Sequence, residues 1–149
     1  HGLVLACNEG AVMTVGFGHR YPSVEVWSTS RVDQPWRVDD EGIDAVSDLL
    51  HAAHVAVSDD VPANEEWHYR PMGTGVTVPW RIILKLRIST LAGFEGGTKI
   101  YVNTISPAAL AAMLLPKLFQ ARAAGRIAPM DLGDECEIPR GALAATWVR

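Results

Sequence analysis

The sequence VPWRIILKLRISTLAGFEGGTKIYVN, residues 78–103, decides the fold of this chain. Its first half alternates between large apolar side chains and mostly charged ones, in the period of two that is typical of a β-strand with one buried face. The face expected in the core carries Trp80, Ile82, Leu84, Leu86 and Ile88, and the opposite face carries Arg81, Ile83, Lys85, Arg87 and Ser89. Because burial of each large apolar side chain contributes roughly 1.5–3 kcal/mol, we expect this strand to be central in its sheet.

A glycine-rich loop follows this strand. Gly93, Gly96 and Gly97 predict a tight bend, because glycine tolerates backbone conformations that other residues avoid. The β-prone run at residues 100–103 then predicts a second strand.

Upstream runs also have the composition of strands. Residues 2–7 and 11–17 are short and apolar, and the turn signal Asn8-Glu9-Gly10 between them predicts a hairpin. Residues 24–28 and 64–71 predict two more strands. Period-two alternation in the last of these places Glu66, His68 and Arg70 on one face and Glu65, Trp67 and Tyr69 on the other.

Apolar residues at spacings of three and four predict an amphipathic helix that begins at an Asp39 or Asp40 cap and ends at about Ser58. Its expected core face consists of Ile43, Val46, Leu50, Ala53 and Val57. His51 and His54 lie three residues apart on this helix, a spacing that suits a metal ion. No third ligand is close in sequence, so we interpret both as solvated histidines.

A second helix begins at Ser106-Pro107, where a serine cap is followed by proline at the first helical position. It is expected to reach Ala124 and to be kinked or restarted at Pro116. Its expected core face consists of Leu110, Met113, Leu114, Leu118 and Phe119. Residues 126–149 hold an acidic patch and an apolar end, which we interpret as a C-terminal tail or an edge element.

This order of strands, helix, strands and helix, with short connections, predicts an α+β fold with an antiparallel sheet and helices packed mainly on one face. At 149 residues we expect one domain, residues 1–149. A hydrophobic content of 48% with 20% charged residues is typical of a soluble globular protein, and a net charge of −4 disfavours binding to nucleic acid or to an anionic membrane. The sequence has no run of 18 apolar residues and no export signal, so we expect a cytoplasmic protein.

The two cysteines, Cys7 and Cys136, lie far apart in the sequence. Neither belongs to a Cys-x-x-Cys or Cys/His cluster, so zinc-site spacing is absent and we expect no metal and no cofactor. We favour two reduced thiols, and the sequence leaves a disulfide between them open.

Two segments resemble a known family. STLAGFEGGTKIYVNTISPAALAAMLL, residues 89–115, and NEGAVMTVGFGHRYPSVEVW, residues 8–27, are similar to galactose-1-phosphate uridylyltransferase-like proteins of the histidine-triad superfamily. The resemblance covers roughly residues 4–115, corresponds to the C-terminal half of the two-halved uridylyltransferases, and implies the same antiparallel architecture.

The chain departs from this family where the chemistry is expected. The family's His-x-His motif falls on Pro79 and Arg81, with Trp80 kept between them, and two other characteristic positions fall on Val24 and Val32. His68 is the family histidine that remains. A nucleophile needs a free lone pair at neutral pH, which an arginine guanidinium does not offer.

Two hypotheses follow. The first is a diverged uridylyltransferase-like protein, with a degenerate active site, that binds a phosphorylated or carboxylated small molecule and is a binding protein or a repurposed biosynthetic enzyme. His68 and Glu66 would transfer protons, and the ligand-binding residues would be Arg81, Lys85, Arg87, Arg70, Phe94 and Glu95. In the family, the positions of Phe94 and Glu95 approach the sugar of a nucleotide-sugar, partly across a dimer interface.

The second hypothesis is a non-catalytic subunit that pairs with a histidine-bearing chain or with itself, as a homodimer or as a heteromer with a related half. A plain alternative to the first also stays open. Arg81, Lys85 and Arg87 would then be part of a solvated sheet face, and Glu66, His68 and Arg70 a row of salt bridges. The sequence does not name a substrate.

Overall fold

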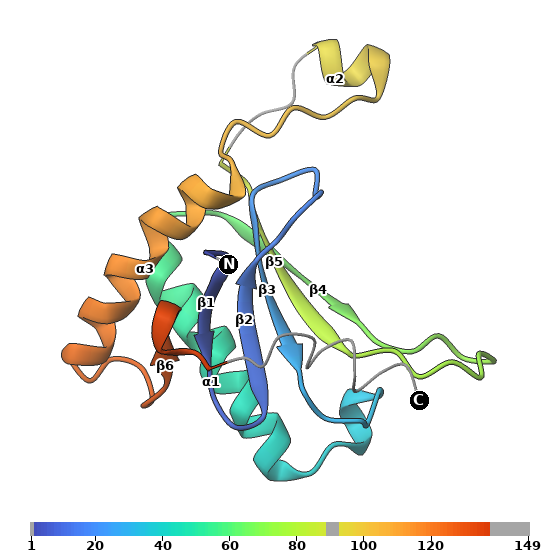
Figure 1. Cartoon of the computed structure of the whole chain (residues 1–149). Helices are drawn as coiled ribbons and strands as arrows, with labels where there is room; N and C mark the ends of the chain where they lie inside the picture. Colours follow the sequence, from blue (N-terminus) through green and yellow to red (C-terminus); the bar gives the residue numbers. More distant parts are fainter. Residues whose placement is uncertain (1, 89–92, 138–149) are drawn as a thin grey trace.

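The computed structural model describes residues 2–88 and 93–137 of the chain (Figure 1). Its strands are β1 (Val4–Cys7), β2 (Ala11–Val15), β3 (Ser23–Ser28), β4 (Ala63–His68), β5 (Arg81–Leu86) and β6 (Asp131–Leu132). Its helices are α1 (Asp40–Val57), α2 (Gly93–Thr98) and α3 (Pro107–Ala123), with short 3-10 turns η1 (Pro35–Arg37) and η2 (Gly133–Glu135).

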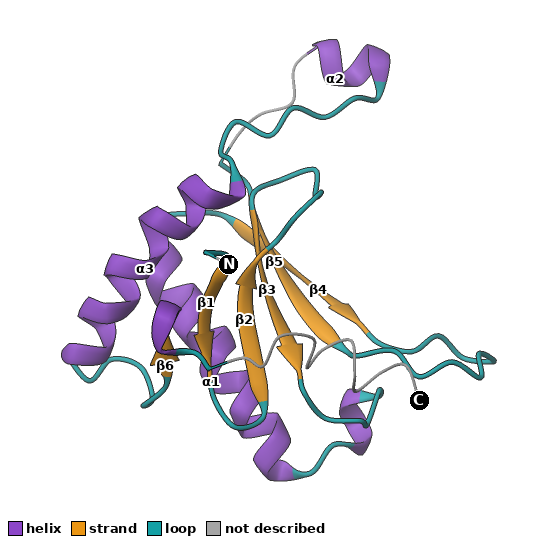
Figure 2. Cartoon of the chain, in the orientation of Figure 1, coloured by secondary structure: helices purple, strands orange, loops and turns teal. Residues whose placement is uncertain are grey.

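The strands described here form one sheet in the order β4-β5-β3-β2-β1-β6, and all neighbouring pairs are antiparallel. Helices α1 and α3 pack against each other and against the same face of the sheet, as Figure 2 shows. The predicted α+β class, with helices on one face of an antiparallel sheet, is confirmed. We call the other face, which these two helices leave uncovered, the open face.

Strand β5 has the interior position expected of it, between β4 and β3. Trp80, Ile82, Leu84 and Leu86 belong to the hydrophobic core, as the alternation predicts. The prediction is wrong for Ile88, which lies beyond the end of the strand and is 41% exposed. Ile83 points to the open face and is nevertheless buried.

The two long helices begin at the predicted caps. Asp39 caps α1 by accepting a hydrogen bond from the backbone N–H of Gly42 at 3.0 Å, and Ser106 caps α3 by accepting one from Ala109 at 3.2 Å. Helix α3 continues through Pro116 and is not restarted there. Leu110, Leu114 and Leu118 face the core, but the prediction is wrong for Met113 and Phe119, which are exposed.

Residues 93–105 differ most from expectation. The predicted glycine bend is a short helix, α2, and the structure gives no strand to residues 100–103, so that prediction is wrong. In Figure 1 this segment projects from the body of the fold, and Ile100 and Val102 are 60% and 57% exposed. A β-prone sequence forms a strand only where a neighbouring strand supplies hydrogen bonds, and none of the described strands pairs with this arm.

The segment after α3 returns to the sheet. Strand β6 pairs with β1 at the edge, with Leu132 fully buried opposite Ala6. Among the described helices, none is both long and apolar enough to cross a lipid bilayer.

Candidate functional site

A row of paired residues crosses the open face. His68 on β4 lies opposite Arg81 on β5, and Arg81 lies opposite Trp27 on β3. Directly opposed residues in antiparallel strands share a face, so these three side chains are neighbours. The Arg81 guanidinium carbon lies 4.3 Å from the centre of the Trp27 ring, which adds a cation–π contact.

The adjacent row is acidic. Glu66 on β4 and Glu25 on β3 lie on either side of Ile83 on β5, which is two residues along the strand from Arg81 and therefore on the same face. Lys85 Nζ donates to Glu66 Oε1 at 2.6 Å, and the Nε2 of His68 lies 3.4 Å from Glu66 Oε2. The hydrogen bond from Lys85 lowers the pKa of Glu66, so this carboxyl is held in its charged form.

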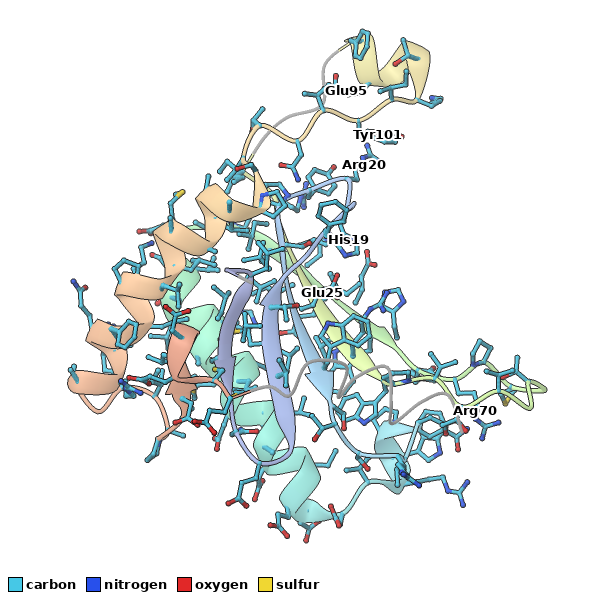
Figure 3. The ribbon with its side chains drawn as sticks, in the orientation of Figure 1. His19, Arg20, Glu25, Arg70, Glu95 and Tyr101 are labelled. Atoms are coloured by element: carbon cyan, nitrogen blue, oxygen red, sulfur yellow. The ribbon has the colours of Figure 1, made fainter. Side chains whose placement is uncertain are left out.

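Glu25 is the buried acid of the site. Its side chain is only 8% exposed, and its Oε1 accepts a hydrogen bond from the Nε2 of His19. Its Oε2 lies 3.9 Å from the Nε of Arg81. A buried carboxylate needs partners of opposite charge or donors, and His19 and Arg81 are those partners. Figure 3 shows His19 directed toward Glu25 from the loop that joins β2 and β3.

Two glycines allow that loop to place His19. The backbone N–H of Gly16 donates to Ser23 O at 2.7 Å, which closes the loop. A Cβ at Gly16 would lie 2.1 Å from Ser23 Oγ and 2.8 Å from His19 Cδ2, so the position has no room for a side chain. Gly18 has a φ of +78°, a conformation that favours glycine.

The cations predicted to line β5 are therefore compensated by acids. Arg81 and Lys85 lie on the open face as expected, but Glu25 faces Arg81 and Glu66 binds Lys85. Arg87 lies past the end of β5 and is exposed, and its backbone N–H donates to Pro62 O. The face is a mixed array of charges and imidazoles.

Arg70 is separated from the other residues of its predicted row. Strand β4 ends at His68, and Arg70 forms an ion pair with Asp33, with 2.6 Å between Nε and Oδ2, while its Nη1 donates to Thr74 O at 2.9 Å. Figure 3 shows it away from Glu25 and His19. The expectation that Glu66, His68 and Arg70 share a face therefore fails for Arg70, because the strand is shorter than its sequence pattern.

Phe94 and Glu95 also lie apart from this cluster. Both belong to α2 on the projecting arm, where Phe94 is 56% exposed. Figure 3 shows Glu95 on the arm, with Tyr101 closer to the body. The Arg20 guanidinium lies 4.2 Å from the centre of the Tyr101 ring and links the arm to the β2–β3 loop.

The sequence analysis missed His19, Glu25 and Trp27 as site residues. One signal was present, since a glutamate in the middle of the apolar run SVEVW is unusual for a strand in the interior of a sheet. The register that brings β3 beside β5 was not readable, because the two strands are far apart in sequence. Among the described residues, the His, Cys, Asp and Glu side chains make no group of three or more suited to a metal ion.

This arrangement places an imidazole next to a guanidinium, the two kinds of group that proton transfer and anion binding require. His68 is about half exposed and touches a carboxylate, so it can exchange protons with a bound molecule. Arg81 has no side-chain hydrogen bond among the described residues and lies between the two histidine–glutamate pairs. A phosphate or carboxylate would find a guanidinium donor there.

Solved structures with the same fold are uridylyltransferases and their relatives. A uridylyltransferase matches with a TM-score of 0.67 and 17% identity over 80% of this chain and 42% of its own. A GALT-like protein from Arabidopsis thaliana matches with a TM-score of 0.69 and 20% identity over 76% of this chain and 40% of its own. An ADP-glucose phosphorylase from Arabidopsis thaliana, solved with bound ADP-glucose, gives a TM-score of 0.68 and 20% identity over 76% and 39%.

The chain thus spans about two-fifths of the length of these structures, and the matched part is their C-terminal half, as the resemblance implied. At this level of identity the likeness establishes the fold. No curated protein matches the chain by sequence. The family model described as "Domain of unknown function (DUF4921)" matches residues 1–145.

Proposed function

We propose, for a chain that belongs to the DUF4921 family, that the open face binds a phosphorylated or otherwise anionic small molecule beside His68 and Arg81. Arg81 would bind the anionic group, and His68 with Glu66 would transfer protons if the bound molecule reacts. By the resemblance, the family's His-x-His positions fall on Pro79 and Arg81, neither of which is a nucleophile, so a covalent nucleotidyl intermediate is not part of the proposal.

The main support for this proposal is that His68 on β4 lies directly opposite Arg81 on β5. The fold is that of proteins described as a uridylyltransferase and as an ADP-glucose phosphorylase with bound ADP-glucose. A nucleotide-sugar is therefore the first ligand class to test. Glu25 and Glu66 limit the excess of positive charge, so we expect binding to depend on hydrogen-bond geometry as well as on charge.

The test is ligand-dependent thermal unfolding with ADP-glucose, UDP-glucose, glucose 1-phosphate and a small dicarboxylate. A ligand at a hundredfold excess over its dissociation constant stabilises the folded state by about 2.7 kcal/mol, which is readily seen as a higher Tm. The variant Arg81→Ala should lose the ligand-induced rise in Tm. Arg81→Lys should keep part of it, since lysine keeps the positive charge but lacks the planar guanidinium group that can donate two parallel hydrogen bonds.

Arg126→Ala is the matched control. It removes the same charge from an exposed residue in the turn after α3, away from β4 and β5. The proposal fails if no compound on the panel raises the Tm of the unmodified protein. It also fails if Arg81→Ala and Arg126→Ala retain equal shifts.

A second candidate function is supported by the projecting arm. Phe94, Ile100 and Val102 lie on this one short segment and are each more than half exposed, and a concentration of exposed apolar side chains is typical of an interaction surface. The arm would then pair this chain with a second copy or with a histidine-bearing chain that has the missing chemistry.

Sedimentation equilibrium tests self-pairing. If the arm mediates it, Ile100→Asp combined with Val102→Asp should convert a dimer into a folded monomer, with the far-ultraviolet circular dichroism unchanged. Met72→Asp is the control, because Met72 is 91% exposed and lies outside the arm. A monomeric unmodified protein would exclude self-pairing, and co-purification with a histidine-bearing relative would then test the heteromer.

A further inference from the structure

Cys7 and Cys136 are brought together at the sheet edge although they lie at opposite ends of the sequence. Cys7 is the last residue of β1 and lies opposite Asp131 of β6. The chain then turns through η2, and the Sγ of Cys136 donates to the carbonyl oxygen of the same Asp131 at 3.3 Å. Residues opposed across an antiparallel pair have Cα atoms about 4.5–5.5 Å apart, so Cys7 and the Cys136 thiol are both neighbours of Asp131.

The thiols also affect each other directly. Burial raises the pKa of the Cys136 thiol, and the neighbouring Cys7 thiol raises it further. Both side chains are half-buried and both thiols are free. Cys7 also lines a surface cavity of about 920 Å³ with Arg122, Pro129 and Asp131, so a small reagent can reach it.

We propose that Cys7 and Cys136 form a redox-active dithiol, a modification site that a small-molecule disulfide closes into an intramolecular bond. This bond would join the edge segment 131–136 covalently to β1. It is independent of the ligand proposed for the open face.

The reaction is thiol–disulfide exchange in two steps. A thiolate of one cysteine attacks the reagent disulfide, which forms a mixed disulfide and releases one reagent thiol. The thiolate of the second cysteine then attacks the protein-bound sulfur, which forms the Cys7–Cys136 bond and releases the second thiol. The protein loses two protons and two electrons, and the reagent is reduced to two thiols.

The probe is bis(2-hydroxyethyl) disulfide, which is uncharged. This choice matters because Glu9, Asp131 and Glu137 line the same cavity and would repel an anionic reagent. The native protein is treated with the probe, free thiols are blocked by alkylation, and the intact mass is measured. The variants Cys7→Ser and Cys136→Ser are treated in parallel, and each serves as the control for the other.

The expected product from the unmodified protein is a monomer that has lost two hydrogen atoms and takes up no alkylating reagent. Each single variant should instead retain one hydroxyethyl mixed disulfide. Closure should be faster in the native protein than in concentrated urea, on the order of tenfold or more, because unfolding separates the two ends. Hydrogen exchange of the amides at 131–136 should slow on oxidation.

Two results would overturn the proposal. One is an unmodified protein that keeps both thiols open to alkylation, or that carries a mixed disulfide on each cysteine. The other is disulfide-linked dimers as the main product on a non-reducing gel. Both outcomes are measured on the unmodified protein, so a folding defect in either variant does not affect them.

Discussion

Asn8 in the β1–β2 turn donates a hydrogen bond from Nδ2 to the carbonyl oxygen of Ala45 in α1, at 2.8 Å and 37 residues away in the sequence. The same side chain accepts from the backbone N–H groups of Gly10 at 3.2 Å and Ala11 at 2.8 Å. One amide therefore closes the hairpin and fixes the helix against it. The resemblance matched Asn8 and Glu9 to the family together, and the structure gives the asparagine an architectural role.

We predict that Asn8→Ala lowers the free energy of unfolding by about 1–3 kcal/mol, because it leaves backbone groups in a partly buried turn without partners. Urea unfolding followed by circular dichroism measures the change. Glu9→Ala is the control, since Glu9 is exposed, and it should change the same quantity by less than about 0.5 kcal/mol. Equal effects of the two substitutions would contradict the role of Asn8.

Gly16→Ala should disconnect His19 from Glu25. The new methyl group would overlap Ser23 Oγ and His19 Cδ2, so the β2–β3 loop has to move. We expect a lower Tm, and an imidazole NMR signal of His19 that shifts toward that of a solvated histidine. Gly75→Ala, which adds a methyl group in open space, should leave both unchanged. A His19 signal that is the same in Gly16→Ala and in the unmodified protein would contradict this account of the loop.

Trp80 is the largest fully buried side chain of the core, and its ring stacks on Trp67 with centroids 6.1 Å apart. Trp80→Ala should therefore cost about 3–5 kcal/mol of unfolding free energy. Trp80→Phe should cost less, because it also removes an indole N–H that has no partner among the described residues. Urea unfolding checks both values.

Trp67→Ala is the comparison for the Trp80 variants. Trp67 is 50% exposed, so its removal should destabilise the fold less than removal of Trp80 does. The reverse order would mean that the stacked pair, and not the burial of Trp80, supports this part of the sheet.

Local periodicity in the sequence was enough to predict the main helices and strands. The composition of the candidate site depends instead on which strands, distant in sequence, pair with each other. The alternation around Trp80 and the cap at Asp39 identified β5 and α1 directly, because these signals lie within a few residues. Whether Glu25 lies beside Arg81 depends on which strands become neighbours, and single-strand patterns do not contain that information.

The wrong predictions have the same origin. Residues 100–103 have strand composition, but a strand requires an edge to pair with, and the arm is directed away from the sheet. Arg70 continued the alternation of β4 in the sequence, yet Asp33 from the loop after β3 binds it outside the strand. In both cases a tertiary partner, present or missing, overrode the local pattern.

The ion pair between Arg122 and Glu135 gives a pH prediction. Arg122 Nη1 and Nη2 donate to the two carboxylate oxygens at 2.5 and 2.9 Å, and the backbone N–H of Leu132 donates to the same carboxylate at 3.0 Å. These hydrogen bonds, the one from Arg122 first, lower the pKa of Glu135 from its ordinary 4.5 to about 2. A lowered pKa means that the folded state favours the ionised form more than the unfolded state does.

The stability from Glu135 is therefore fully present above about pH 4.5, the unfolded pKa, and is lost as the pH falls toward 2. Glu135→Gln should have a lower Tm than the unmodified protein at pH 6, and the two Tm values should converge toward pH 2. Asp134→Asn, at an exposed neighbour in the same turn, should keep the acid dependence of the unmodified protein. If the Tm of Glu135→Gln stayed below that of the unmodified protein by the same amount from pH 6 to pH 2, the prediction would be contradicted. The loss of stability would then come from the packing of glutamine and not from the missing carboxylate charge.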